Sequence, residues 1–243
     1  MADSFPRIEP LGADALLVRF SDRLDDAANR ACVSFRAALQ ASPPEGALET
    51  ASSLGSVLVR VAAGDAGRVQ DALRRLLDAR DWATVPPPPR RLWSIPCSYG
   101  GADGPQLAET AEMVGMTAEQ ATEALSTARV RVLSLGFAPG MPYLGILPEV
   151  WDLPRQTALT PKVPEGALVV AVRQFVLFGT EAPTGWRQVG RTLFGCFEQA
   201  RPRPIALSPG DEVQFPAVSG EALRDGASRD SERHGGASWT VLE

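Results

Sequence analysis

The sequence is poor in the residues that most often perform chemistry in proteins. Its 243 residues include one histidine, His234, and three cysteines, Cys32, Cys97 and Cys196. A single histidine excludes a two-histidine metal site and argues against a Ser-His-Asp triad, and cysteines so far apart form neither a disulfide framework nor a metal cluster. We expect the thiols to be buried and free, and we expect His234 to lie in a solvated polar tail.

The sequence also lacks a large excess of one charge and any long apolar run. Its 24 Lys and Arg stand against 29 Asp and Glu, for a net charge of −5, so nothing favours nucleic acid as a partner. No apolar run reaches the ~18 residues that a membrane helix needs, and the first residues lack the basic and apolar segments of a secretory signal. We expect a cytoplasmic protein with no nucleic-acid partner, no membrane partner and no metal site.

Residues 1–85 predict a small N-terminal α/β domain. The elements expected from apolar runs and helical spacing are a strand at 15–20, a helix at 25–40, strands at 47–51 and 56–62, and a helix around 69–77. Asp22 or Asp25 would cap the first helix. This β-α-β-β-α order resembles a ferredoxin-like split-βαβ domain, and none of its residues suggests catalysis.

Four consecutive prolines favour an extended spacer, so we place a linker at 86–90. Residues 91–218 combine helices at 105–115 and 117–128 with short apolar runs between Gly/Pro turns, which predicts a β-barrel or sandwich. The expected class is therefore α+β with two domains. Residues 219–243 are expected to be a mobile polar tail. Its final run, SWTVLE, is either a loose end, which we favour, or a strand that pairs at an edge.

Glycine and proline are densest between Leu135 and Thr192, in the segments LGFAPGMPYLG, TPKVPEG and EAPTGWRQVGRT. Glycine permits positive φ and proline fixes φ, so these segments predict tight turns. The rings of Phe137, Tyr143 and Trp186 stand beside these turns and predict the walls of a ligand pocket. The alternative is a structural corner of the barrel whose aromatic rings belong to the core.

Three polar residues in this region are candidates for chemistry. Lys162 could hold an anion, Gln174 could bind an amide through its paired donor and acceptor, and Arg191 could clamp a carboxylate or phosphate. Each has a structural alternative. Lys162 would be an exposed turn charge, Gln174 a solvated or internally satisfied amide, and the arginine a cation stacked on Trp186.

The blocks SYGGADGPQLAETAEMVGMTAEQ, LGFAPGMPYLG, TPKVPEG, GWRQVGRT and SPGDEVQF resemble, in order and spacing, the KipI/PxpB family. Its members are also known as the B subunit of 5-oxoprolinase or as allophanate hydrolase subunit 1, a carboxyltransferase-type domain. The resemblance implies a small α/β domain followed by a cyclophilin-like β-barrel. It also implies a larger homologous partner (the C subunit of 5-oxoprolinase, or allophanate hydrolase subunit 2) and a third, lactam-hydrolysing subunit. One branch of the family inhibits a sporulation histidine kinase.

The chain departs from the family pattern at several places. Leu125 lies near the position of the usual histidine before the LGF block, and Lys162 replaces the arginine of a TPR turn. Val172 and Arg173 replace two glycines of the family's GGQTG, while Gln174 stays. A bulky, charged arginine beside the expected pocket could change or close the site, so the chain is identified as a divergent member.

The leading hypothesis is a subunit of an ATP-dependent hydrolase that acts on a cyclic amide, most simply 5-oxoproline, or on a related allophanate or urea-like substrate. ATP would be used at the complex with the larger subunit, and this chain would be inactive alone. The residues expected to act in catalysis are Gln174, Lys162 and Arg191. Those expected to bind substrate are Phe137, Pro139, Gly140, Tyr143, Arg173 and Trp186. The alternative is a non-catalytic regulator that binds and inhibits a histidine kinase.

Overall fold

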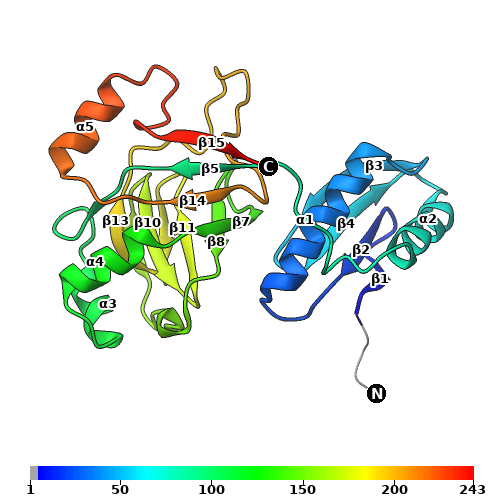
Figure 1. Cartoon of the computed structure of the whole chain (residues 1–243), viewed down its shortest axis with the longest axis horizontal. Helices are drawn as coiled ribbons and strands as arrows, with labels where there is room; N and C mark the ends of the chain where they lie inside the picture. The colour runs from blue at the N-terminus through cyan, green and yellow to red at the C-terminus, as the bar shows by residue number, and fades with distance from the viewer. Residues whose placement is uncertain (1–4) are drawn as a thin grey trace. The chain divides into compact units, whose positions relative to one another are not determined.

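The computed structural model describes residues 5–243, which form two compact units. The first unit reaches Pro89 and the second runs from Arg90 to Leu242 (Figure 1). Each unit buries apolar clusters of its own. Among residues 5–243, every helix falls short of the length and apolarity that crossing a membrane requires.

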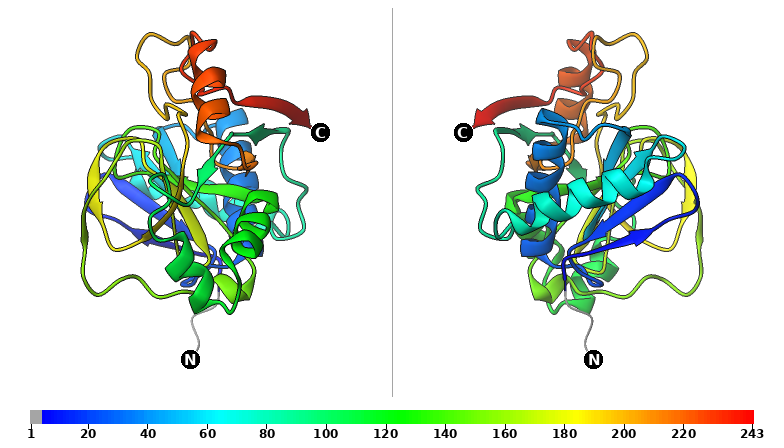
Figure 2. Two further views of the ribbon diagram at one scale, coloured as in Figure 1. Left: turned by 90° about the vertical axis from the view of Figure 1, so that its left-hand side faces the viewer. Right: turned by 90° about the vertical axis from the view of Figure 1, so that its right-hand side faces the viewer.

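The first unit is a four-stranded antiparallel sheet with two helices on one face (Figure 2). Its elements are β1 (Arg7–Pro10), β2 (Ala15–Arg19), α1 (Asp26–Ala41), β3 (Ala47–Ser52), β4 (Ser56–Val61) and α2 (Ala66–Asp78). The strand order is β1-β2-β4-β3. In this order β4 lies between β2 and β3, as expected for a split-βαβ unit, and β1 is the edge strand beside β2.

Local signals account for most of these elements. The carboxylate of Asp25 accepts a hydrogen bond from the backbone N–H of Ala28 at 2.7 Å, so Asp25 and not Asp22 caps α1. The sequence does not predict β1, because this half-exposed edge strand has a single aliphatic residue, Ile8, and therefore no apolar alternation.

The second unit contains a nine-stranded sheet in the order β15-β5-β14-β7-β8-β11-β10-β13-β6 and a two-stranded sheet of β12 and β9. The strands are β5 (Arg90–Ser94), β6 (Ser98–Tyr99), β7 (Val130–Leu135), β8 (Pro142–Gly145), β9 (Thr160–Val163), β10 (Ala167–Ala171), β11 (Gln174–Leu177), β12 (Ala182–Thr184), β13 (Arg187–Arg191), β14 (Glu212–Gln214) and β15 (Ser238–Leu242). The helices are α3 (Leu107–Met113), α4 (Ala118–Thr127), α5 (Gly220–Ser228) and the short 3₁₀ turn η1 (Glu149–Trp151).

The large sheet is strongly curled, as the ribbon shows (Figure 1). Residues 90–99 contribute to both of its ends, because β5 pairs with β14 whereas β6, only a few residues later, pairs with β13. The structure thus supports a mixed α/β fold with a curled half-barrel sheet. Thr117 and Gln120 form a capping box at the start of α4. Ile205 forms only an isolated bridge, with Phe197.

The expectation of a mobile tail at 219–243 is wrong. Ser219 caps α5 by accepting a hydrogen bond from Ala222, and β15 pairs antiparallel with β5, with Trp239 opposite Trp93. Arg201 donates hydrogen bonds to the backbone carbonyls of Gly195, Glu232 and Arg233. The tail composition is polar, but its order comes from distant partners that composition does not reveal.

Candidate functional site

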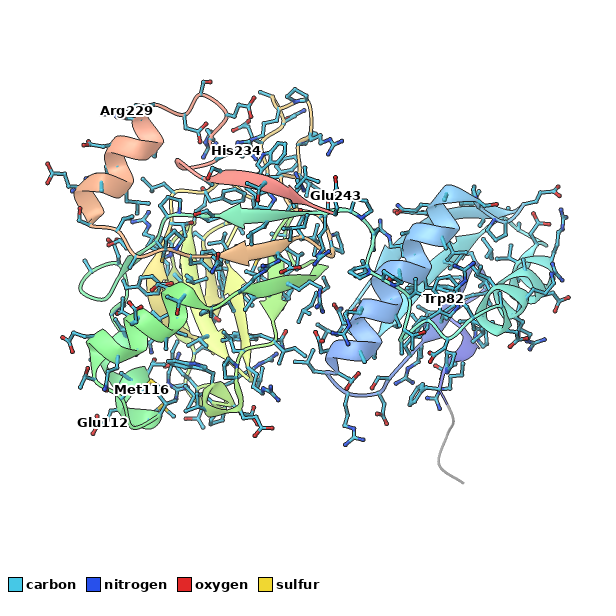
Figure 3. The ribbon with its side chains drawn as sticks, viewed as in Figure 1. Trp82, Glu112, Met116, Arg229, His234 and Glu243 are labelled. Carbon is cyan, nitrogen blue, oxygen red and sulfur yellow. The ribbon has the colours of Figure 1, made fainter. Side chains whose placement is uncertain are left out.

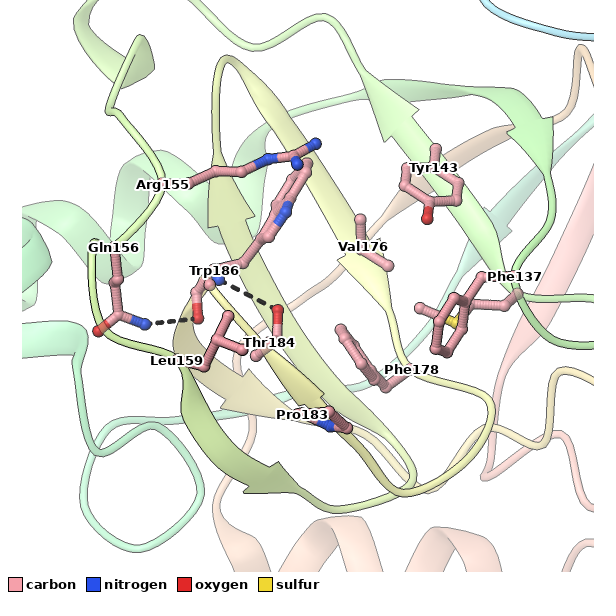
Figure 4. A pocket seen from close by; sticks show the side chains of 12 residues that line it. Phe137, Tyr143, Arg155, Gln156, Leu159, Val176, Phe178, Pro183, Thr184 and Trp186 are labelled. Carbon is pink, nitrogen blue, oxygen red and sulfur yellow. Dashed lines mark hydrogen bonds between the residues drawn. The ribbon is translucent and has the colours of Figure 1, made fainter.

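A pocket of ≈ 250 Å³ lies beside the curled sheet of the second unit (Figure 4). Its lining comes from five short segments that are distant in sequence: the loop at 137–141, β8, the segment 155–159, the end of β11, and residues 183–186. Phe137, Tyr143 and Trp186 all line it. The structure therefore brings the three aromatic residues selected from the sequence to one pocket.

The loop before β8 sets the position of Phe137. Phe137 itself has a φ of 73°, and Gly140 has a φ of 71°. A Cβ on Gly140 would lie 2.5 Å from the carbonyl oxygen of Cys196, so only glycine allows this close approach of two backbones. The loop is anchored there, and the side chain of Phe137 remains 73% exposed at the pocket rim.

Trp186 is the buried wall of the pocket. Its backbone N–H donates to Thr184 Oγ1 at 3.0 Å, and its carbonyl accepts a hydrogen bond from Gln156 Nε2 at 3.0 Å. The guanidinium of Arg155 lies over its ring, 5.4 Å from the centroid, in cation–π geometry. On the other side, the ring of Tyr143 meets it edge-on at 6.4 Å. The indole is thus fixed from several directions.

The four polar residues selected from the sequence do not line this pocket. Lys162, on β9, is exposed and forms an ion pair with Glu181 at 2.7 Å. Arg173 donates from Nε to the carbonyl of Leu147 at 2.9 Å. Gln174 is buried at the start of β11, where its Oε1 accepts no hydrogen bond from residues 5–243. Neither its amide nor Arg191 is among the lining residues.

Val172 and Arg173 form the tight turn between β10 and β11. Their φ values are 43° and 61°, in the left-handed region that glycine adopts freely. The two positions at which the family has glycine are therefore turn positions, and neither Val172 nor Arg173 is among the lining residues of the pocket. The side chain of Arg173 instead donates to the carbonyl of Leu147. Pro139 and Gly140 belong to the anchored loop rather than to the lining.

Three polar residues of the pocket were missed by sequence reasoning: Arg155, Gln156 and Thr184. Arg155 and Gln156 lie in a segment without regular secondary structure, so no periodicity points to them. Thr184 stands two residues before Trp186 in the APTGW block, and that adjacency was the available signal.

The histidine and the cysteines lie outside the pocket lining. His234, which is labelled in Figure 3, is not a solvated tail residue, because its ring stacks on Phe194 at 5.9 Å and meets Trp93 edge-on at 5.5 Å. Burial, followed by the positive charge of Arg201, lowers the pKa of His234. Cys32, Cys97 and Cys196 are buried and free, and burial raises the pKa of the Cys32 and Cys196 thiols to about 12. These thiols are not ionised nucleophiles at neutral pH.

Comparison of the sequence with known proteins identifies the family of the chain. The chain matches the model of the carboxyltransferase domain, subdomain C and D, over residues 6–207. It is 39% identical over 145 residues to the B subunit of 5-oxoprolinase from Escherichia coli O157:H7, covering 60% of this chain and 66% of that protein. It is 27% identical over 227 residues to the Bacillus subtilis protein of the same name, covering 88% of this chain and 93% of that one.

Solved structures agree in fold. The crystal structure of TTHA0988 is similar with a TM-score of 0.72 and 29% identity, covering 85% of this chain and 40% of that chain. The urea amidolyase of Kluyveromyces lactis has a TM-score of 0.68 and 17% identity, covering 97% of this chain and 16% of that chain, a likeness of fold alone. Because the family model spans most of the sequence, the chain belongs to the carboxyltransferase domain family, subdomain C and D, and is of the KipI/PxpB type.

Proposed function

We propose that this chain is one subunit of an ATP-dependent amide-cleaving enzyme of the 5-oxoprolinase type, which converts 5-oxoproline to L-glutamate. Two relatives that are named as the B subunit of 5-oxoprolinase support this assignment. Allophanate or a urea-like substrate is the related alternative. In this proposal the curled sheet is the cyclophilin-like barrel of the family, and the enzyme acts in the cytoplasm.

The observation that carries the proposal is a shaped pocket whose lining, within residues 5–243, contains no pair of a nucleophile and an activating base. Phe137, Tyr143 and Trp186 supply its rings, whereas no Cys, His, Asp, Glu or Lys of the described chain is among its lining residues. Such a site can bind and orient a small molecule, but proton transfer needs a positioned acid or base. We infer that the reaction centre is completed by a larger homologous subunit, with a third subunit for lactam hydrolysis.

The size and charge of this pocket argue against ATP as its ligand. Sites for drug-sized ligands measure about 300–1,000 Å³, and this one has ≈ 250 Å³. A triphosphate also requires several cationic or backbone N–H donors, and Arg155 is the one charged residue that the described chain contributes to the lining. We therefore place the nucleotide at the complex with the larger subunit, outside this pocket.

The test is co-expression with the larger homologous subunit, followed by measurement of 5-oxoproline-dependent ATP hydrolysis. We expect a stable complex and turnover that neither subunit shows alone. Allophanate and urea, assayed in parallel, separate the related substrates. A chain that fails to associate with the larger subunit, or a complex that hydrolyses ATP with none of these substrates, would overturn the proposal. Inhibition of a histidine kinase by such a chain would instead support the regulator hypothesis.

A further inference from the structure

The side chains that face the pocket leave hydrogen-bond donors unused. The guanidinium of Arg155 has no acidic partner within residues 5–243; its contact is the ring of Trp186. The phenol of Tyr143 has no hydrogen-bond partner in the same range, and its oxygen points into the pocket (Figure 4). The hydroxyl of Thr184 accepts from the backbone of Trp186, so its own proton remains available to donate.

The side-chain amide at the pocket edge, by contrast, is already engaged. Gln156 donates through Nε2 to the carbonyl of Trp186 at 3.0 Å, and its Oε1 accepts from Gln106 Nε2 at 2.6 Å. No carboxylate of the described residues lines the pocket. Each free polar group of the lining side chains can therefore donate, one of them is cationic and none is anionic. The complementary ligand is rich in acceptors and carries a negative charge.

The remaining lining restricts the ligand further. Val176, Phe178 and Leu159 are apolar, and the rings of Tyr143 and Trp186 form two walls. A phosphate or sulfate would leave these apolar surfaces without a partner, and phosphate sites usually combine several donors with backbone amides. A small cyclic molecule with apolar ring atoms and one carboxylate satisfies both parts of the lining.

We propose that this pocket binds a small cyclic carboxylate and that Arg155 is the anchor for its carboxyl group. Stacking on Trp186 holds the guanidinium plane in place, so its outward N–H groups form a fork that matches a carboxylate. Thr184 and Tyr143 add one hydroxyl donor each. The inference rests on the proposed function only for the identity of the ligand, 5-oxoproline, which has a five-membered lactam ring and one carboxylate.

Two other cations of the region are excluded as anchors by their contacts. Lys162 is ion-paired with Glu181, and Arg173 is hydrogen-bonded to the carbonyl of Leu147. Arg155 has neither kind of partner within the described part of the chain and lines the pocket. In this assignment Arg155 takes the anion-binding role that the sequence suggested for Lys162 and Arg191, and Arg191 is not among the lining residues.

The first experiment is calorimetric titration of the isolated chain with 5-oxoproline and, separately, with 2-pyrrolidinone, which has the same ring without the carboxylate. We expect saturable binding of 5-oxoproline and much weaker binding of the neutral lactam. Arg155→Ala should weaken 5-oxoproline binding by roughly 10- to 100-fold, the range for a lost hydrogen bond to a charged group. Arg155→Lys should retain part of it. Arg203→Ala, which removes an exposed arginine of the same unit, should leave it unchanged.

Several results would overturn the inference. These are an absence of saturable 5-oxoproline binding in both the isolated chain and the complex, equal binding of 2-pyrrolidinone, or equal binding by Arg155→Ala. Thermal unfolding of each variant identifies misfolding, and Arg155→Lys then provides the decisive comparison. Inorganic phosphate, used as a further probe, should not compete; competition would show a general anion site instead.

The complex separates this inference from the proposed function. If the complex turns over 5-oxoproline, Arg155→Ala should raise KM with a smaller change in kcat, since a contact that holds the carboxylate equally in the bound substrate and in the transition state contributes uniform binding. An unchanged KM would disprove the role of Arg155 and leave the proposed function intact. Binding of 5-oxoproline through Arg155 without turnover in any complex would disprove the proposed function and leave the role of Arg155 intact.

Discussion

Strands β10 and β11 present two different environments on their two faces. Phe175 and Leu177 of β11 belong to the larger apolar cluster, which the helices α3 and α4 help to close. Their neighbours Val176 and Phe178 belong to a smaller cluster and line the pocket. β10 alternates in the same way, with Val170 in the larger cluster and its neighbours in the smaller one.

The two faces are both apolar and differ in how closely their side chains are packed. β10 is buried at all five positions and so is β11 at all four, so the strands read as continuous apolar runs. We call the face that packs in the larger cluster the closed face and the face that lines the pocket the open face. On the closed face, aromatic rings contact one another, as Phe175 and Phe215 do at 5.7 Å. On the open face, the rings of Tyr143 and Trp186 leave space for a ligand. We infer that the closed face supplies stability and the open face supplies binding.

The largest effect should come from emptying the closed face. Phe175 is fully buried, and Phe175→Ala should lower the free energy of unfolding by about 3–5 kcal/mol, the usual cost of a lost core phenylalanine. Phe137→Ala, at the exposed rim, should change it by less than about 0.5 kcal/mol. Urea unfolding of both variants measures the contrast. Equal losses in the two variants would break the distinction between the faces.

A second, smaller effect should show that the pocket loop is anchored on the backbone of the second unit. Gly140→Ala places a Cβ against the carbonyl of Cys196 at a positive φ, which should cost about 1–3 kcal/mol. Gly136→Ala is the matched control, because a Cβ there meets no atom within 4 Å. Unfolding measurements on the two variants should differ accordingly. If Gly136→Ala costs as much as Gly140→Ala, the anchor is absent.

A feature of the fold or of the pocket can be predicted from the sequence when the residues that form it are close together in the chain. Asp25 and Thr117 act on backbone groups within three residues, so local patterns identify both caps. The rings of Phe137, Tyr143 and Trp186 stand next to turn residues, and turn chemistry marks them. Their meeting in one pocket was an interpretation of that pattern, and the structure places them together.

The features that could not be predicted depend on partners far along the chain. β15 pairs with β5, and the ring of half-buried His234 packs on Phe194 and Trp93. The composition of the tail reveals none of these partners. Arg155 is a candidate because it has no acidic partner within residues 5–243, and only the three-dimensional structure shows which charged groups lie near one another. The ion pair of Lys162 with Glu181 at 2.7 Å likewise depends on a partner that the sequence alone does not reveal.

The next prediction concerns the open face. Tyr143→Phe keeps the ring and removes the hydroxyl, for which no partner exists within residues 5–243, so stability should stay within about 0.5 kcal/mol. Binding of 5-oxoproline should weaken by roughly 3- to 10-fold, the cost of one neutral hydrogen bond. Calorimetry and urea unfolding on one preparation measure both. A loss of stability without a loss of affinity would assign the hydroxyl to the core instead.

The smallest expected effect is the pH dependence of stability that comes from an ion-paired carboxylate near the closed face. Glu212 on β14 is bound by Arg90 at 2.5 Å and also by Arg129. Burial raises the pKa of Glu212, but the hydrogen bonds from Arg129 and Arg90 outweigh it and hold that pKa below its usual value. A depressed carboxyl pKa stabilises the folded state above the unfolded pKa of about 4.3, and this contribution is lost as pH falls through the folded pKa.

The stability difference between the wild-type chain and Glu212→Gln should therefore be constant near neutrality and shrink as pH falls below about 4.3. Urea unfolding at a series of pH values measures it. Arg155→Ala is the matched variant on the open face, and its stability difference from wild type should not vary over the same range, because Arg155 has no acidic partner within the described residues. A difference that shrinks for Arg155→Ala as well would mean that a carboxylate pairs with it, and the open face would lose its unpaired cation.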